Sequence, residues 1–177
     1  MNITHTPLAG CFVIEPQVFG DSRGNFMESY NQEKFPAKVQ FVQDNQSTSQ
    51  KGVLRGLHFQ KGEHAQAKLV RVIRGEVLDI AVDIRPNSET FGQHFSIVLN
   101  DTNNKQLFVP RGFAHGFAVL EDDTIFAYKC DNFWNKESES GIMYNDPDIA
   151  IDWMLSEDEI VLSDKDKILP TLKSITL

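Results

Sequence analysis

Residues 77–84 read Val77-Leu78-Asp79-Ile80-Ala81-Val82-Asp83-Ile84, and this stretch indicates the class of fold. Its even positions are all apolar, whereas its odd positions include two aspartates. A period of two is typical of a β-strand with one face buried against apolar neighbours. Similar short stretches, separated by Gly, Pro, Asn or Asp, recur at 11–18, 24–30, 40–44, 53–60, 68–74, 93–99, 106–109, 116–120 and 124–130. Many short strands at roughly even spacing predict an all-β protein, whether a sandwich, a barrel or a jelly roll.

The chain has 177 residues, and 17 Lys and Arg against 25 Asp and Glu give it a formal charge of −8. We expect one domain over residues 1–177, because this length suits a full core and no repeat or linker divides it. Hydrophobic residues make up 41%, too many for a disordered chain, and the apolar runs are too short to cross a bilayer. The acidic balance argues against broad binding of nucleic acid or anionic membrane, so an anionic ligand must meet a local cluster of Arg and Lys.

The two cysteines and the N-terminus predict a cytoplasmic setting. Cys11 and Cys130 are not part of a Cys-x-x-Cys pair, and residues 1–10 lack the pattern of a signal peptide. We therefore expect two free thiols.

Helical signals are weak and lie at the edges of the strand pattern. Residues 31–35 predict a turn or two before Pro36. Ser156-Glu157-Asp158-Glu159 has the pattern of a capping box that opens a short helix. The Leu-containing tail after it is expected to pack back on the strands.

Residues 52–60, Gly-Val-Leu-Arg-Gly-Leu-His-Phe-Gln, carry the first side chains suited to chemistry. Strand alternation sends Arg55 and His58 to opposite faces unless Gly56 bends or bulges the strand. His58 is either a core histidine bonded to a carbonyl or a catalytic group. Lys68 shares its strand parity with valines, so it either extends to water or is held in a cavity, where its charge would suit a developing oxyanion.

Pro110, Gly112 and His115 form a Pro-x-Gly-x-x-His pattern that resembles the second half of the cupin signature. In metal-binding cupins this histidine joins a His-x-His pair from an earlier strand. Here the earlier strand offers His58 followed by Phe and Gln, and His64 is expected in a loop. Because ligation of zinc or iron needs convergent imidazoles, we expect no bound metal.

Aromatic residues near 128–134 allow two interpretations each. Tyr128 shares a strand face with Phe126 and Cys130, so it is either core or a proton donor facing a polar cavity. Phe133 and Trp134 are either core or a stacking platform for a flat ring.

Ten blocks carry a more specific resemblance. They are 19–30 (FGDSRGNFMESY), 41–45 (FVQDN), 53–60 (VLRGLHFQ), 68–70 (KLV) and 110–117 (PRGFAHGF), followed in order by Tyr128-Lys129, Glu139, Asn145-Asp146, Ile151-Asp152-Trp153 and 162–166 (LSDKD). Together they closely resemble the dTDP-4-dehydrorhamnose 3,5-epimerase family over nearly the whole chain.

The resemblance implies a cupin-like jelly roll with short peripheral helices, no metal and no other cofactor, working as a homodimer. The implied substrate is dTDP-4-dehydro-6-deoxy-D-glucose, inverted at the two carbons that flank its C4 ketone to give dTDP-4-dehydro-L-rhamnose. No nucleic acid or membrane partner is expected.

Roles for single residues follow from position within the family pattern. The resemblance implies that His58 is the general base, Tyr128 the general acid, and Lys68 the cation near the C4 oxygen. Asp166 matches the carboxylate that pairs with the histidine, although Asp164 lies only two residues away and stays an alternative. The implied substrate-binding positions are Arg23, Phe26, Glu28, Gln43, Asp44, Asn45, Arg55, His115, Trp134, Glu139 and Lys165, and Arg23 and Glu28 are expected to reach into the site of a second copy.

One departure from the family bears on the alternatives. Many relatives carry Tyr-Tyr where this chain has Phe133-Trp134, and the resemblance implies that the second residue stacks on the thymine, a role Trp134 retains. Three other functions are weighed: epimerisation at C3 or C5 alone on a related keto sugar, a cupin that binds nucleotide without catalysis, and a metal-dependent cupin dioxygenase. The missing second histidine argues against the last, and the joint presence of His58, Tyr128, Lys68 and Asp166 argues against a silent protein.

Overall fold

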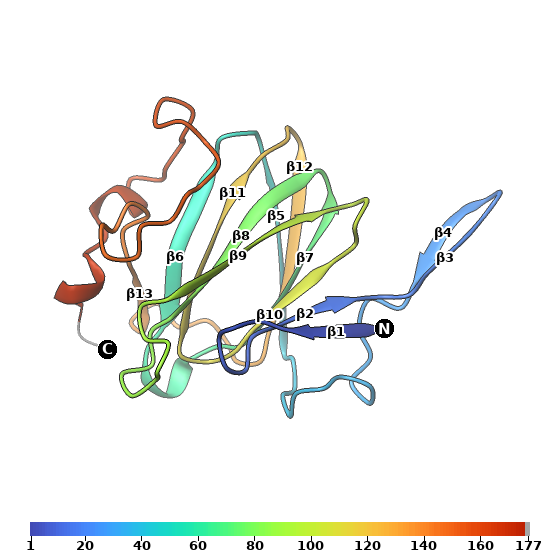
Figure 1. The fold of residues 1–177 in the computed structure, drawn as a ribbon, viewed down its shortest axis with the longest axis horizontal. Helices are drawn as coiled ribbons and strands as arrows, with labels where there is room; N and C mark the ends of the chain where they lie inside the picture. Colours follow the sequence, from blue (N-terminus) through green and yellow to red (C-terminus); the bar gives the residue numbers. More distant parts are fainter. Residues whose placement is uncertain (176–177) are drawn as a thin grey trace.

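The computed structural model describes residues 1–175 as two antiparallel β-sheets packed face to face (Figure 1). The six-stranded sheet has the order β1 (Asn2–His5), β2 (Phe12–Glu15), β10 (Gln106–Val109), β7 (Lys68–Arg74), β12 (Thr124–Cys130), β5 (Gln43–Ser49). The five-stranded sheet has the order β13 (Glu139–Gly141), β6 (Leu54–Gln60), β11 (Phe113–Val119), β8 (Glu76–Asp83), β9 (His94–Asn100). Three short 3-10 helices, η1 (Gly62–His64), η2 (Asp166–Ile168) and η3 (Leu172–Ser174), lie outside the sheets. The prediction of an all-β jelly roll with short peripheral helices is confirmed.

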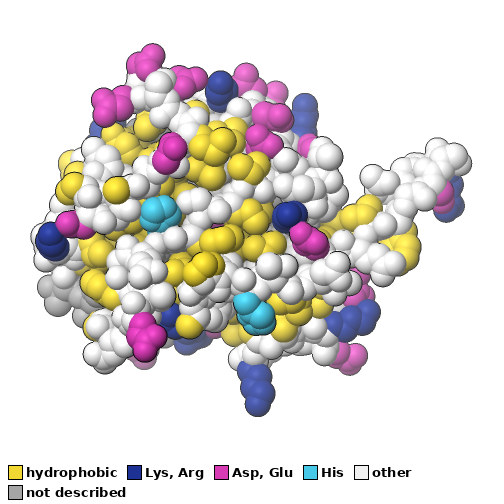
Figure 2. Space-filling model, in the orientation of Figure 1, with side chains coloured by type: hydrophobic (Ala, Val, Ile, Leu, Met, Phe, Trp, Pro, Cys, Tyr) yellow, Lys and Arg dark blue, Asp and Glu magenta, His cyan; other side chains and the backbone are white. Residues whose placement is uncertain are grey.

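A hairpin of β3 (Val18–Asp21) and β4 (Gly24–Met27) projects far from the body (Figure 1). Phe19 and Phe26 on this hairpin are 55% and 70% exposed. Figure 2 shows further hydrophobic side chains where the hairpin joins the body. Within residues 1–175, no helix has the length and apolar character needed to span a membrane.

Strand β8 is buried on both faces, and its two faces meet different layers. Val77 and Ala81 face the other sheet, and their cluster includes Val70 and Phe126 from that sheet and Phe117 from the neighbouring strand β11. The fully apolar face packs instead under the C-terminal segment, in a cluster that holds Leu78, Ile80, Val82, Ile84, Ile142, Trp153 and Leu172. The tail therefore packs back on the strands as predicted, because the outer face of this sheet is too apolar to meet water.

Most predicted strands are present, and three have the predicted bounds, namely 68–74, 106–109 and 124–130. Strand β5 is the main correction. It was expected at 40–44 but covers Gln43–Ser49, a wholly polar stretch. Its inward side chains line a polar cavity and its other face is exposed at the sheet edge, so apolar patterning could not reveal it. Strands β1, β3 and β13 have no counterpart of their own among the predicted stretches.

The helix predicted from residue 156 is wrong. The capping contacts form, since the Ser156 hydroxyl donates to Glu159 Oε2 at 2.8 Å, but they close only a turn. Val161 then pairs with the chain before β6, donating its N–H to the Gly52 carbonyl and accepting from the Leu54 N–H. Extended pairing to residues 52–54 thus takes the backbone groups that a helix would have used.

Both cysteines are free and buried, which agrees with the prediction of two free thiols. Burial raises the pKa of the Cys130 thiol to about 11.

Gly56 gives the fold its first testable prediction. Its φ is +128°, and a Cβ there would lie 2.6 Å from Gly116 Cα and 2.9 Å from the His115 carbonyl oxygen. We expect Gly56→Ala to lower the free energy of unfolding by roughly 1–3 kcal/mol through backbone strain alone, with the overlap adding to this. Urea denaturation measures it. Gly62→Ala is the matched control, because Gly62 also has positive φ but nothing lies within 4 Å of its Cβ position. Equal losses for the two variants would contradict the steric argument.

Candidate active site

Two adjoining hollows, of about 610 Å³ and about 430 Å³, open beside the edge strand β5. Both have the size of small-molecule sites. The larger lies between β5, β6 and the C-terminal segment 161–166, and the smaller extends toward residues 133–139. Four side chains line both hollows: Asn45, His58, Lys68 and Tyr128.

His58 and Asp166 form a hydrogen-bonded pair at the wall of the larger hollow. The distance from His58 Nε2 to Asp166 Oδ1 is 2.5 Å, and the aspartate side chain is 3% exposed. Asp166 opens η2, and its backbone N–H donates to the Ser163 hydroxyl at 3.1 Å. Asp164 is fully exposed and pairs with Lys167. The structure therefore gives His58 the partner Asp166 and not Asp164.

The Asp166 carboxyl is kept ionised by this pairing. Burial acts to raise the pKa of Asp166, but the hydrogen bond and charge of His58, with the Ser163 hydroxyl, bring it below its usual value. A carboxylate held on Nε2 orients the imidazole with its N–H toward Asp166 and its Nδ1 lone pair free.

A bulge in β6 brings Arg55 and His58 to the same hollow. In the pairing of β6 with β11, His58 lies opposite His115 and Arg55 opposite Phe117, so three steps on β6 match two on β11. The extra residue falls at Gly56 and Leu57, where the glycine adopts positive φ. This is the bend that the sequence required for the two side chains to meet.

Lys68 and Tyr128 come from neighbouring strands β7 and β12. The Lys68 ammonium lies 5.9 Å from the centre of the Tyr128 ring. Burial lowers the pKa of Lys68, and the charges of Asp79 and Glu139 oppose this only in part. Burial likewise raises the pKa of Tyr128, so its phenol holds its proton at neutral pH. Lys68 is therefore held in the cavity, as one of its two interpretations predicted.

Trp134 lies at the rim of the smaller hollow and is 53% exposed. Its backbone N–H donates to Gln43 Oε1 at 3.0 Å. Lys165 lines the larger hollow and Glu139 lines the smaller one. The two side chains form an ion pair, with 2.5 Å between Lys165 Nζ and Glu139 Oε1.

His115 also lines the larger hollow, and its ring, like that of His58, is paired with a carboxylate. Nε2 lies 3.0 Å from both carboxylate oxygens of Asp79, and both side chains are buried. Sequence reasoning missed Asp79. An aspartate at an inward position of an apolar strand was the available signal, since a buried carboxylate needs a partner.

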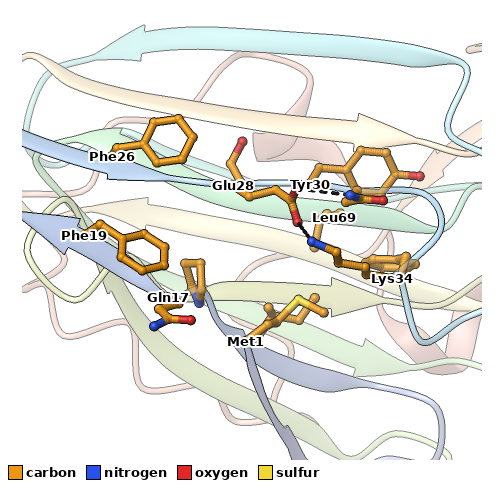
Figure 3. Close-up of a pocket in the computed structure, with 13 residues that line it drawn as sticks. Met1, Gln17, Phe19, Phe26, Glu28, Tyr30, Lys34 and Leu69 are labelled. Atoms are coloured by element: carbon orange, nitrogen blue, oxygen red, sulfur yellow. Dashed lines mark hydrogen bonds and ion pairs between the residues drawn. The ribbon is translucent and has the colours of Figure 1, made fainter.

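Four predicted positions do not join the others in this chain. Asp44 lies on the opposite face of β5 from Asn45 and pairs with Lys129, because successive strand residues alternate in direction. Arg23 and Phe26 lie on the projecting hairpin, and Arg23 pairs with Asp21. Glu28 points to Lys34 beside the groove where the hairpin joins the body (Figure 3). None of these three residues lines either of the two hollows of its own chain.

No group of three His, Cys, Asp or Glu side chains in residues 1–175 is placed to hold a metal ion. His64 lies in η1, as a loop position would require, and its Nδ1 meets the Ser138 hydroxyl at 2.9 Å.

The chain is similar to known proteins over nearly its whole length. The family model described as dTDP-4-dehydrorhamnose 3,5-epimerase matches residues 5–174. A dTDP-4-dehydrorhamnose 3,5-epimerase of Escherichia coli strain K12 is 51% identical over 179 residues, covering 99% of this chain and 96% of that protein. The crystal structure of the enzyme of that name from Elizabethkingia anophelis NUHP1 is 54% identical, with a TM-score of 0.94 and coverage of 98% and 97%. A dTDP-6-deoxy-D-glucose-3,5-epimerase from Legionella pneumophila Philadelphia 1, solved with dTDP-4-keto-L-rhamnose, is 48% identical, with a TM-score of 0.94 and coverage of 99% and 94%.

Proposed function

The chain belongs to the dTDP-4-dehydrorhamnose 3,5-epimerase family, and from this we propose that it inverts C3 and C5 of dTDP-4-dehydro-6-deoxy-D-glucose to give dTDP-4-dehydro-L-rhamnose. One observation on this chain supports the proposal independently of its family membership. The His58–Asp166 pair, the Lys68 ammonium and the Tyr128 phenol all meet one hollow. A base, a cation and an acid around one space are the groups that α-proton exchange beside a ketone requires.

The reaction starts at the C4 ketone. A hydrogen on C3 or C5 becomes acidic only when negative charge on the C4 oxygen is stabilised, and Lys68 supplies a fixed positive charge for it. His58 Nδ1 takes the proton, and Asp166 stabilises the imidazolium that forms. The electron pair of the broken C–H bond moves into the enolate, so the carbon becomes planar.

Inversion requires the new proton to arrive from the opposite face of the ring. Tyr128 gives its phenolic proton to the enolate carbon, which restores the C4 ketone with the opposite configuration. Solvent then returns a proton to Tyr128 and removes one from His58. The same cycle at the other α-carbon completes the double inversion.

We assign the nucleotide part of the substrate to the rim of the smaller hollow. Trp134 offers an exposed indole for stacking on thymine, and Gln43 and Glu139 lie beside it. Although the chain is acidic overall, Arg55 and Lys165 provide positive charge for the diphosphate of the substrate.

We further propose a cytoplasmic homodimer in which Arg23, Phe26 and Glu28 of each chain reach the cavity of the other. Their exposure on a hairpin directed away from their own cavity supports this. Sedimentation equilibrium tests the dimer.

Incubation with the 4-keto sugar in D2O tests the function directly. Wild-type protein should place deuterium at both C3 and C5, whereas well-folded protein that exchanges neither carbon would refute the proposal. Deuterium at one carbon only would indicate a single-position epimerase.

Tyr128→Phe separates exchange from inversion. The variant retains His58 and Lys68, so we expect deuterium still to enter the substrate with retained configuration, while the inverted product falls by about 10²-fold or more. NMR of the sugar measures both. Tyr144→Phe, which removes a phenol hydroxyl outside both hollows, is the matched control and should invert both carbons. Full inversion by Tyr128→Phe would remove the phenol from the mechanism.

A further inference from the structure

A loop of residues 131–138 joins β12 to β13 and is tied to the body at both of its ends. The Asp131 N–H donates to the Ala67 carbonyl at 3.1 Å, and the Ser138 carbonyl accepts from the Lys61 N–H at 2.8 Å. In the part of the chain that the structure describes, no backbone–backbone hydrogen bond reaches the middle of this loop. Side chains must therefore hold the middle of the loop in place.

Two glutamines, one from each sheet, hold two consecutive residues in the middle of this loop. Gln43 Oε1, on β5, accepts from the Trp134 N–H at 3.0 Å. Gln60 Oε1, on β6, accepts from the Asn135 N–H at 2.9 Å. Because a backbone N–H can only donate, each glutamine must turn its amide oxygen toward the loop. Two adjacent peptide groups are thus fixed from both sheets of the sandwich.

Gln60 is the more deeply buried of these two glutamines, and the proposed mechanism gives it no role. It is 8% exposed, whereas Gln43 is half-buried. It is the last residue of β6, lies opposite Glu139 in the pairing with β13, and lines the smaller hollow together with Trp134. Strand alternation puts it on the same face as His58, two residues earlier. Its amide is therefore a rigid support between the reacting groups and the loop.

The Trp134 indole has little packing of its own to fix it. More than half of the residue is exposed, and Trp134 belongs to none of the apolar clusters found in residues 1–175. A ligand that stacks on a mobile side chain must bear the entropy cost of ordering it. Hydrogen bonds to the backbone at positions 134 and 135 lower this cost, because they fix the attachment of the indole before the ligand arrives.

We propose that Gln60 is a positioning residue for the nucleobase, because its hydrogen bond to Asn135 fixes the Trp134 indole as a stacking surface. This rests on the proposed function, which places the thymine on Trp134. Gln60 acts through Trp134 and does not touch the reacting carbons. Its loss should therefore weaken the binding of the nucleotide and leave the chemical steps at C3 and C5 unchanged.

Gln60→Met removes the hydrogen-bond acceptor and keeps the length of the side chain. The affinity for dTDP, measured by calorimetry, should fall by about 3- to 10-fold, the loss expected for one neutral hydrogen bond. The KM for the 4-keto sugar should rise by a similar factor while kcat stays within about twofold, because stacking of the base contributes equally to the ground state and the transition state. Gln60→Ala, which cannot overpack the end of the strand, gives the same test if the methionine variant does not fold.

A double-mutant cycle tests whether Gln60 acts through Trp134. Trp134→Ala removes the stacking surface, so adding Gln60→Met to it should change kcat/KM by less than about twofold. Asn103→Leu is the matched control, because Asn103 Oδ1 also accepts from a backbone N–H, that of Lys105, at 2.9 Å, but lines neither hollow. This control should lower the temperature of unfolding and leave the affinity for dTDP unchanged.

Three results would overturn the assignment. An unchanged affinity of Gln60→Met for dTDP would mean that the indole needs no such support. An equal loss in the Trp134→Ala background would mean that Gln60 contacts the ligand itself. A fall in kcat at unchanged KM would mean that the substitution acts on His58, two residues away on the same strand. Failure of the proposed function is distinct, because wild-type protein would then exchange no deuterium, whereas the affinity for dTDP is measured without turnover.

Discussion

His58→Ala should lose deuterium exchange at both C3 and C5, by about 10²- to 10⁴-fold, while still binding dTDP. The His58 imidazole meets the hollow with the Asp166 carboxylate on Nε2, which leaves Nδ1 to the substrate. Removal of the ring leaves the α-proton without an acceptor. Exchange in D2O followed by NMR measures the loss at each carbon separately.

A matched control makes this result specific. His64 is also a half-buried histidine with a side-chain partner, but it bonds Ser138 and does not line either hollow. His64→Ala should therefore exchange at the wild-type rate. Near-normal turnover by His58→Ala would show that another group is the base. Loss at one carbon with retention at the other would mean that the two protons have different acceptors.

Lys68→Met should lower kcat by about 10²- to 10³-fold with a smaller change in KM, because the ammonium acts mainly on charge that develops in the transition state. Methionine has a similar length and no charge, so the apolar surroundings of Val70 and Val72 are preserved. Lys129→Met is the control, since Lys129 lies on the same sheet but pairs with Asp44 on the outer face. Steady-state kinetics separate kcat from KM.

The pH profile of the same variants tests the charge itself. Burial lowers the pKa of Lys68, so the cation loses its proton at a lower pH than an exposed lysine would. Activity that needs the cation is full below this pKa and falls as the pH rises through it. Lys68→Arg, which stays charged, should move this alkaline decline to higher pH. An identical decline in wild type and Lys68→Arg would assign it to another group, with Tyr128 the first to test because its phenol must hold its proton to act as the acid.

Strand bounds could be predicted where a strand has apolar residues at alternate positions and a turn at each end. Strands β7, β10 and β12 satisfy both conditions, and their predicted bounds were correct. Strand β5 satisfies neither, because its inward face serves a polar cavity. The turn at 156–159 shows the converse, since its local contacts formed as predicted while pairing with residues 52–54 stopped a helix.

For the candidate site, the sequence indicated which residues could act but not whether their side chains line the same hollow. Local alternation separated Arg55 from His58, and only the bulge opposite β11 brings them to one hollow. The sequence also could not distinguish Asp164 from Asp166 as the partner of His58, because the two aspartates lie two residues apart. The first turn of η2 directs Asp166 inward to His58 and leaves Asp164 in solvent.

The sequence by itself determined the all-β class, the family and the set of side chains fit for proton transfer, because these depend on residue type, periodicity and order along the chain. The tertiary structure decided which of them share a cavity, that Asp79 holds His115, and that the hairpin residues lie away from their own cavity. The physical reason is that such contacts join strands remote in sequence. Their geometry depends on sheet register, bulges and burial, none of which a single strand's own residues can fix.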